Sequence, residues 1–201
     1  MKAFLIITIA VALVVIAAQV KTARSAERIE QYSFKVIKTY GDFEIRHYDR
    51  AIFARTRVDA TSYRNGSSAA FRTLASYIFG GNERNESIAM TSPVAMRQDQ
   101  GLEMEFMMPS KYSLETLPAP SRQNIEFYEK PDVVMAAVSF SGWASDAKIS
   151  QMTQVLTSLL EKEGIEHTGN FIYLGYNPPY QVINRRNEIV VELTGYQIAG
   201  N

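Results

Sequence analysis

The spacing of apolar and polar positions changes several times along this 201-residue chain, and each change predicts an element. Residues 32–38 and 43–48 alternate between apolar and polar side chains around a Gly-Asp turn, which is typical of a β-hairpin. Apolar runs at 51–58 and again at 133–140 predict two further strands. The folded part of the chain is therefore expected to begin with β-structure.

Two segments have the periodicity of helices instead. The first should run from the possible caps at Asn65–Ser68 to a stop at Gly80, and the second from Ser145 or Asp146 to a stop at Gly164. Each helix has one apolar stripe, which must cover a sheet. The residues expected to be buried along these stripes are Phe71, Leu74, Ile78, Ile149, Met152, Leu156 and Leu159.

The order of these elements occurs twice. A strand, a turn, a helix, a glycine stop, a segment broken by proline and an apolar strand follow one another from Ala51 and again from Val133. The spacing of roughly eighty to ninety residues is too long for a solenoid. It favours a duplicated β-α-β-β unit, with pseudo-repeats at about 32–116 and 121–196 joined by the proline-rich run 117–120.

Five motifs occur in the order known from one protein family. They are Tyr77–Asn82, Ile88–Val94, Phe106–Pro109, Gly142–Ser145, and Leu174–Pro179 with Arg185–Glu188. Through them the chain resembles the SOUL haem-binding proteins, in particular bacterial members with a hydrophobic N-terminal segment. The resemblance implies an α+β fold, a distorted antiparallel β-barrel of two β-α-β-β repeats with two main helices. It also implies non-catalytic binding of haem or a related tetrapyrrole.

Composition narrows the classes of function. An apolar fraction of 46% excludes disorder, and the absence of cysteine excludes disulfides, thiolate metal sites and a cysteine nucleophile. The net charge is zero, and the first 26 residues hold three basic and no acidic side chains. The remainder is therefore slightly acidic, which argues against a nucleic-acid surface.

The N-terminal segment is predicted to meet a membrane. Residues 3–20 are almost wholly apolar, with Lys2 before them and Lys21 and Arg24 after them. Their length is near the lower limit for spanning a bilayer, so we expect an uncleaved anchor, with a cleaved secretory signal as the alternative. Residues 1–26 then form the anchor and the start of a linker, and residues 27–201 form the binding domain in the periplasm or outside the cell.

Haem needs an apolar slot with basic groups for its two carboxylates. Tyr77 and Phe79, near the end of the first helix, could supply aromatic contacts, although core packing is the alternative for both. His47 could be an axial ligand, or simply a histidine at a strand end. His167 lies in a polar turn and is expected to be solvated. The other expected haem-binding residues are Arg72, Met90, Arg185 and Arg186.

No other chemistry has a clear pattern in the sequence. There is no metal-type spacing of His, Asp and Glu, no phosphate loop and no serine nucleophile elbow. Glu103 and Glu105 alternate along one predicted strand, and we expect them to face solvent. Two alternatives to tetrapyrrole binding remain open: a general effector-binding module for other hydrophobic small molecules, and a weak hydrolase that uses an acid in the cleft.

Overall fold

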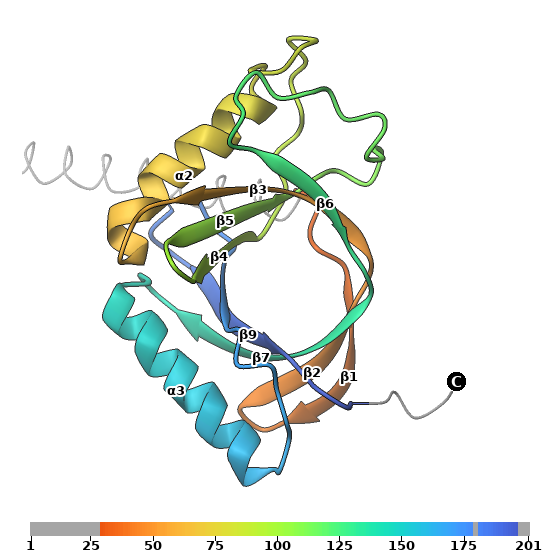
Figure 1. The fold of residues 1–201 in the computed structure, drawn as a ribbon. Coiled ribbons are helices and arrows are strands. Elements are labelled where there is room, and N and C mark those ends of the chain that lie inside the picture. Colours follow the sequence, from red (N-terminus) through yellow and green to blue (C-terminus); the bar gives the residue numbers. More distant parts are fainter. Residues whose placement is uncertain (1–28, 179–180, 197–201) are drawn as a thin grey trace, which may run out of the picture.

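The computed structural model describes residues 29–178 and 181–196. These residues form nine strands and two helices, labelled as in Figure 1. The helices are α2 (Tyr63–Ile78) and α3 (Asp146–Lys162). The strands are β1 (Phe34–Tyr40), β2 (Phe43–Tyr48), β3 (Ala51–Val58), β4 (Val94–Gln98), β5 (Leu102–Met107), β6 (Glu126–Lys130), β7 (Val133–Ser141), β8 (Ile172–Gly175) and β9 (Arg186–Glu192).

All nine strands belong to one antiparallel sheet. Their order is β1-β2-β7-β9-β8-β4-β5-β3-β6, and the sheet curls into a half-barrel (Figure 1). Both helices lie on the outer side of this curled sheet, α2 over β3 and β5 and α3 over β7 and β9. The predicted α+β barrel is confirmed.

The strand order shows how the two units meet. In the first unit, β3, α2, β4 and β5 give the spatial order β4-β5-β3, and in the second, β7, α3, β8 and β9 give β8-β9-β7. The units join through antiparallel pairing of β4 with β8, in which Ala95 lies opposite Leu174. A pseudo-two-fold axis through this pair exchanges the units. Two further strands extend the units, β2 by pairing with β7 and the edge strand β6 by pairing with β3, so each crosses over from the unit that is next to it in sequence.

The start of α2 differs from the prediction. The cap is Ser62, whose hydroxyl accepts a hydrogen bond from the Asn65 backbone N–H, so the cap lies three residues before the run expected to supply it. Gly66 lies inside the helix for a packing reason, because a Cβ there would come within 2.7 Å of Leu102. The second helix is capped by Ser145, one of the two caps predicted for it.

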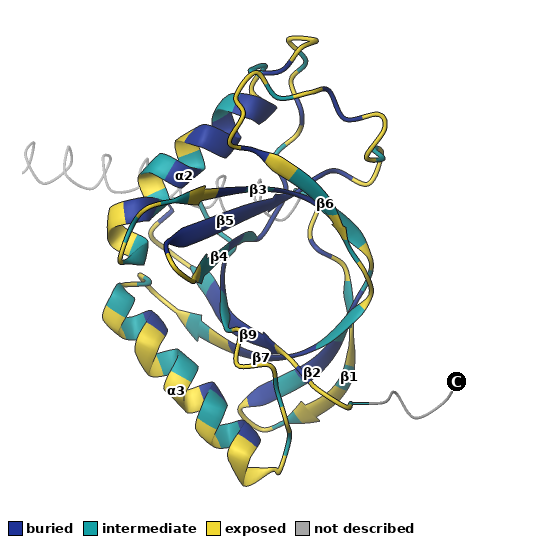
Figure 2. Ribbon diagram, viewed as in Figure 1, coloured by how far each residue is buried: buried dark blue, intermediate teal, exposed yellow. Residues whose placement is uncertain are grey.

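Three apolar clusters fill the molecule, one beneath each helix and one inside the curled sheet (Figure 2). Of the predicted stripes, Leu74, Ile78, Ile149 and Leu156 are buried. Phe71, Met152 and Leu159 are only half-buried, but they pack against the clusters as the flanks of each stripe. The two stripes therefore cover the sheet as expected.

The predicted membrane segment, residues 3–20, lies outside the described residues. Within residues 29–178 and 181–196, neither helix combines the length and the apolar character needed to cross a bilayer.

Candidate functional site

The inner face of the half-barrel carries charged side chains, contrary to expectation. Glu103 and Glu105 on β5 are only 3% and 8% exposed. They alternate along one strand face as predicted, but this face is the concave one, so both carboxylates point into the barrel. The prediction that they face solvent is wrong. Alternation defines a shared face, and in a curled sheet the polar face can be the inner one.

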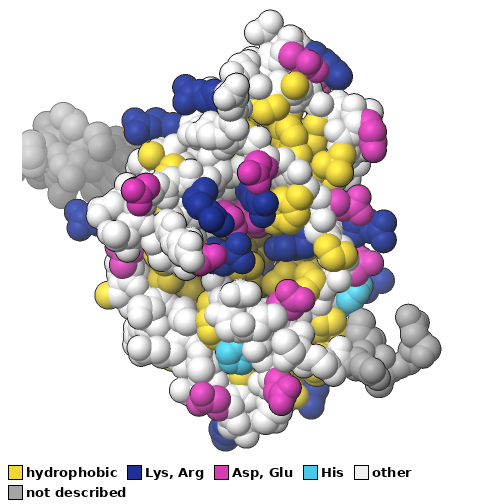
Figure 3. Space-filling view, in the orientation of Figure 1, with side chains coloured by type: hydrophobic (Ala, Val, Ile, Leu, Met, Phe, Trp, Pro, Cys, Tyr) yellow, Lys and Arg dark blue, Asp and Glu magenta, His cyan; other side chains and the backbone are white. Residues whose placement is uncertain are grey.

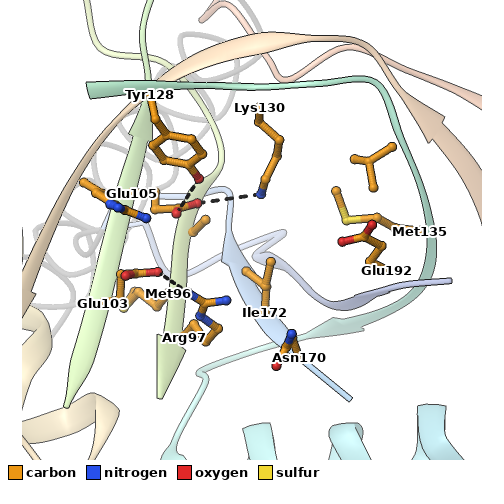
Figure 4. A pocket seen from close by; sticks show the side chains of 13 residues that line it. Met96, Arg97, Glu103, Glu105, Tyr128, Lys130, Met135, Asn170, Ile172 and Glu192 are labelled. Carbon is orange, nitrogen blue, oxygen red and sulfur yellow. Dashed lines mark hydrogen bonds and ion pairs between the residues drawn. The ribbon is translucent and has the colours of Figure 1, made fainter. Parts of the chain in front are cut away.

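A cavity of about 230 Å³ opens beside these carboxylates. Figure 3 looks toward its mouth, where basic, acidic and apolar side chains meet, and Figure 4 shows its walls. The charged lining residues are Arg55, Arg97, Lys130, Glu103, Glu105 and Glu192, drawn from five strands. The apolar lining residues are Ala95, Met96, Val133, Met135 and Ile172.

Glu103 holds one wall of this cavity together. Its carboxylate accepts hydrogen bonds from Arg57 at 2.9 Å and from Arg97 at 2.6 Å, both across neighbouring strands. Burial alone would raise the pKa of Glu103, but the two guanidinium groups outweigh burial and hold the pKa below its usual value. Two positive charges therefore share one negative charge on this wall.

Glu105 is less completely paired. It accepts a hydrogen bond of 2.6 Å from the Tyr128 hydroxyl, while the Lys130 ammonium lies 3.9 Å away (Figure 4). Burial, together with the charge of Glu105, raises the pKa of Tyr128, so this hydroxyl stays protonated and acts as a donor. A nitrogen–oxygen distance of 3.9 Å is beyond a hydrogen bond, so Lys130 keeps donor capacity toward the cavity.

A second charged cluster lies elsewhere in the barrel and is sealed. Glu188 is completely buried and accepts hydrogen bonds from both terminal nitrogens of Arg46, at 2.9 and 3.1 Å. Arg186, Tyr176 and Ser139 also donate to it. Burial opposes ionisation of Glu188, but the Arg46 hydrogen bond and charge hold its pKa below the usual value. This network ties β2, β7 and the segment after β8 to β9.

None of the six predicted haem-binding residues lines the cavity. Tyr77 is part of the core beneath α2, and its hydroxyl donates to the Pro118 carbonyl. Phe79 is 67% exposed, and Arg72 is exposed on the side of α2 that faces away from the core. Both side chains could therefore contact a ligand on the surface. Met90 is half-buried against the same core. The structure therefore does not gather the four residues of the first half around one pocket.

Arg185 and Arg186 differ in what holds them. Arg186 is an ion-pair partner of Glu188. Arg185 donates to the backbone carbonyls of Pro178 and Gln181, at 2.9 and 2.6 Å, and its guanidinium lies 4.3 Å from the centre of the Trp143 ring. Among the described residues it has no carboxylate partner.

Apolar side chains are exposed around this arginine. Trp143 and Val182 are each 59% exposed and Ile183 is 49% exposed. Trp143 belongs to the turn before α3, which the Asn187 side chain ties to β9 through the Gly142 carbonyl at 2.9 Å. We call Trp143, Val182, Ile183 and Arg185 the arginine–tryptophan surface.

The histidines occupy the positions expected from the sequence. His47 is near the end of β2, partly exposed, with Asp49 at 3.9 Å. His167 sits in the turn before β8, where its Nδ1 accepts from the Gly169 backbone N–H. In residues 29–178 and 181–196 no three His, Asp or Glu side chains are placed to hold a metal ion.

Sequence comparison identifies a family. A family model described as "SOUL heme-binding protein" matches residues 29–192. Human "Heme-binding protein 2" is 28% identical over 158 residues, covering 74% of this chain and 77% of that protein. "Heme-binding protein 1" of Xenopus tropicalis is 27% identical over 155 residues, covering 73% and 81%.

Structural comparison finds the same fold at much lower sequence identity. The C-terminal domain of EcmrR superimposes with a TM-score of 0.58 at 12% identity, covering 76% of this chain and 96% of that domain. A hydrolase from Listeria innocua gives a TM-score of 0.52 at 8% identity, covering 78% and 94%. These likenesses concern the fold alone.

Proposed function

This chain belongs to the SOUL family, and from that premise we propose that it binds haem or a related tetrapyrrole without catalysing a reaction on it. The arginine–tryptophan surface is the proposed contact region. The family match and the names of the curated relatives support tetrapyrrole binding. The location is inferred from the arrangement of Arg185.

Arg185 is the observation that carries the proposal. Its guanidinium is held in place by two carbonyls and a tryptophan ring, yet among the described residues no acid neutralises it. A positioned and unpaired guanidinium beside exposed apolar side chains offers what a flat apolar acid requires: a surface for the ring and a partner for a carboxylate. Arg186 is less suited, because it already neutralises Glu188.

The barrel cavity is a poorer place for a tetrapyrrole. Its volume of about 230 Å³ is below the roughly 300–1,000 Å³ of pockets that enclose drug-sized ligands. A surface site is not subject to this limit on ligand size.

Charge reversal at Arg185 tests the location. In titrations of the full-length protein with haem, followed by Soret absorbance, we expect Arg185→Glu to weaken binding more than tenfold. Loss of a charge-assisted pair costs about 1.5–3 kcal/mol, and about 1.4 kcal/mol is a factor of ten. Trp143→Ala should weaken binding as well, because it removes ring contact and the support of Arg185.

Two variants serve as comparisons. His47→Ala should weaken binding less than tenfold if apolar contact and arginine pairing dominate, and its loss of the Soret shift would instead identify His47 as the axial ligand. Arg72→Glu reverses an exposed charge on α2 near Phe79. If Arg72→Glu abolishes binding while Arg185→Glu does not, the tetrapyrrole site lies on α2.

The N-terminal segment supports a further part of the proposal, in which residues 3–20 anchor the protein to a membrane with the domain in the periplasm or outside the cell. The length and apolar character of the run favour this arrangement. Fractionation of cells that express the intact chain tests it. Recovery of full-length protein in the soluble fraction without detergent would contradict anchoring.

A further inference from the structure

The barrel cavity has no part in the proposed tetrapyrrole site, yet its walls hold polar groups with unfilled bonding capacity. The Lys130 ammonium is partly exposed, lies 3.9 Å from Glu105 and 5.2 Å from the centre of the Phe53 ring, and makes no hydrogen bond among the described residues. The Arg97 side chain uses one terminal nitrogen on Glu103, and its Nε is buried without a hydrogen-bond partner. A buried donor is normally satisfied, so the Arg97 Nε indicates a partner that enters the cavity, and Lys130 can donate to the same partner.

Charge is distributed unevenly across the cavity. On one wall Arg57 and Arg97 share the single carboxylate of Glu103, which leaves a positive excess. Glu192 of β9 lies on the side away from Glu103 and Glu105 (Figure 4), and among the described residues its carboxylate makes no ion pair or hydrogen bond. The walls are therefore complementary to a molecule with a negative and a positive end.

The remaining lining is apolar. Met135 and Ile172 contribute to the apolar cluster inside the curled sheet, and Figure 4 shows the Ile172 side chain pointing into the space. Met96 borders the cavity, but it packs against the clusters beneath the helices. A volume of about 230 Å³ is smaller than the pockets of drug-sized ligands. The occupant is therefore small and has an apolar body.

We propose that the barrel cavity is a second ligand site, which binds a free α-amino acid with an apolar side chain. The carboxylate pairs with Lys130 and Arg97, the ammonium group pairs with Glu192, and the side chain lies against Met135 and Ile172. A simple anion leaves Glu192 without a partner, and a simple cation leaves Lys130 and Arg97 without one. Only a zwitterion uses both walls, and this site is separate from the arginine–tryptophan surface.

Methionine methyl groups allow a direct test. In the full-length protein labelled with ¹³C at the methionine methyls, L-leucine, L-methionine and L-phenylalanine are titrated and the methyl signals followed by NMR. The signal of Met135, which lines the cavity, should shift and saturate. The signal of Met152 on α3, beneath the other face of the sheet, should not move.

Two analogues of leucine separate the charges. 3-Methylbutylamine lacks the carboxylate and 4-methylpentanoate lacks the ammonium group, and each should bind at least about fivefold more weakly than L-leucine. Glu192→Gln should weaken the binding of L-leucine by about the same factor. It should leave the affinity for 4-methylpentanoate unchanged, because that ligand has no ammonium group to pair with Glu192. Lys130→Met should weaken the binding of L-leucine and leave the affinity for 3-methylbutylamine unchanged.

The matched control is Glu161→Gln on the exposed part of α3, which should change nothing. Glu192 is also exposed, so its variant is expected to fold, and thermal unfolding checks this for each protein. The proposal is overturned if none of the three amino acids shifts the signal of Met135, or if either analogue binds as tightly as L-leucine. It is also overturned if Glu192→Gln affects L-leucine and 4-methylpentanoate equally. Haem titration of the same variants reports independently on the proposed surface site.

Discussion

The two halves of the barrel carry the same pair of charges at equivalent positions, but only one half seals them. The pseudo-two-fold axis exchanges Ala95 and Leu174, which lie opposite Glu105 and Glu188 respectively. Strand register then makes Lys130 on β6 the equivalent of Arg46 on β2. Each half therefore has one acid and one base at matching sites, and in both halves the base lies on a strand that crosses over, β2 or β6.

The two pairs differ in how closely the base approaches the acid and in how many hydrogen bonds join them. Arg46 contacts Glu188 through two nitrogens, and the pair is almost entirely excluded from water. Lys130 approaches Glu105 only to 3.9 Å, beside a cavity. A planar guanidinium can fill both acceptor positions of a carboxylate, whereas an ammonium group is a single point of charge. The same scaffold position thus serves packing in one half and leaves space for a ligand in the other.

The largest expected effect is loss of the sealed pair. Arg46→Met should lower the free energy of unfolding by about 3 kcal/mol, the lower end of the range for breaking a buried ion pair, because Arg186 still contacts Glu188. Lys130→Met should cost about 1 kcal/mol or less, as expected for a loose and partly exposed pair. Urea denaturation of both variants measures the difference. Equal losses would show that the cavity cluster supports the fold as strongly as the sealed cluster.

The second-largest effect is expected from acid, which should weaken the sealed cluster around Glu188. The folded-state pKa of Glu188 lies below its ordinary value of 4.5. As the pH falls through 4.5, the unfolded chain takes up a proton before the folded protein does, so stability is complete above this value and declines below it. The loss is expected to be smaller than that from Arg46→Met, because protonation leaves both side chains in place.

Glu188→Gln isolates this contribution. The variant starts from a lower stability, but its decline below pH 4.5 should be shallower than that of the natural chain, because one carboxylate with a lowered pKa is gone. Urea midpoints measured across the acid range give both slopes. Identical slopes would assign the acid sensitivity to other carboxylates, of which Glu103 is the first candidate because its pKa is also lowered.

Elements with local signals could be predicted from the sequence. The stripes at Leu74 and Leu156 fixed the helices, and the glycine stops fixed their ends, because these signals lie within one element. The start of α2 was misplaced, since Gly66 marks close packing on Leu102 rather than a cap. That contact joins residues far apart in sequence, so no local pattern reveals it.

The charged inner face of the sheet could not be predicted from the sequence for a similar reason. Alternation placed Glu103 and Glu105 on one face but did not say which face is concave. The crossover of β2 and β6 brings Arg46 to Glu188 and Lys130 to Glu105, and neither contact follows from neighbouring residues. Family resemblance identified the barrel, but the residues predicted for haem lie on or just after α2, in the core beneath it, and at the start of β9. For Glu103 and Glu105 the sequence held one signal, two acids within an otherwise apolar strand.

The smallest expected contrast between the two clusters comes from the two tyrosines that donate to these carboxylates. Tyr176 donates to Glu188 at 2.7 Å and Tyr128 to Glu105 at 2.6 Å, so the bonds are of similar length and only their surroundings differ. Tyr176→Phe removes a donor from a carboxylate that water cannot reach, and should cost about 1.5–3 kcal/mol. Tyr128→Phe removes a donor beside the cavity, where water can replace it, and should cost about 0.5–1.5 kcal/mol. The free energy of unfolding of both variants, measured in urea, decides the order. If Tyr128→Phe is the more damaging, Glu105 is the more isolated carboxylate, and the distinction between a sealed and an open cluster fails.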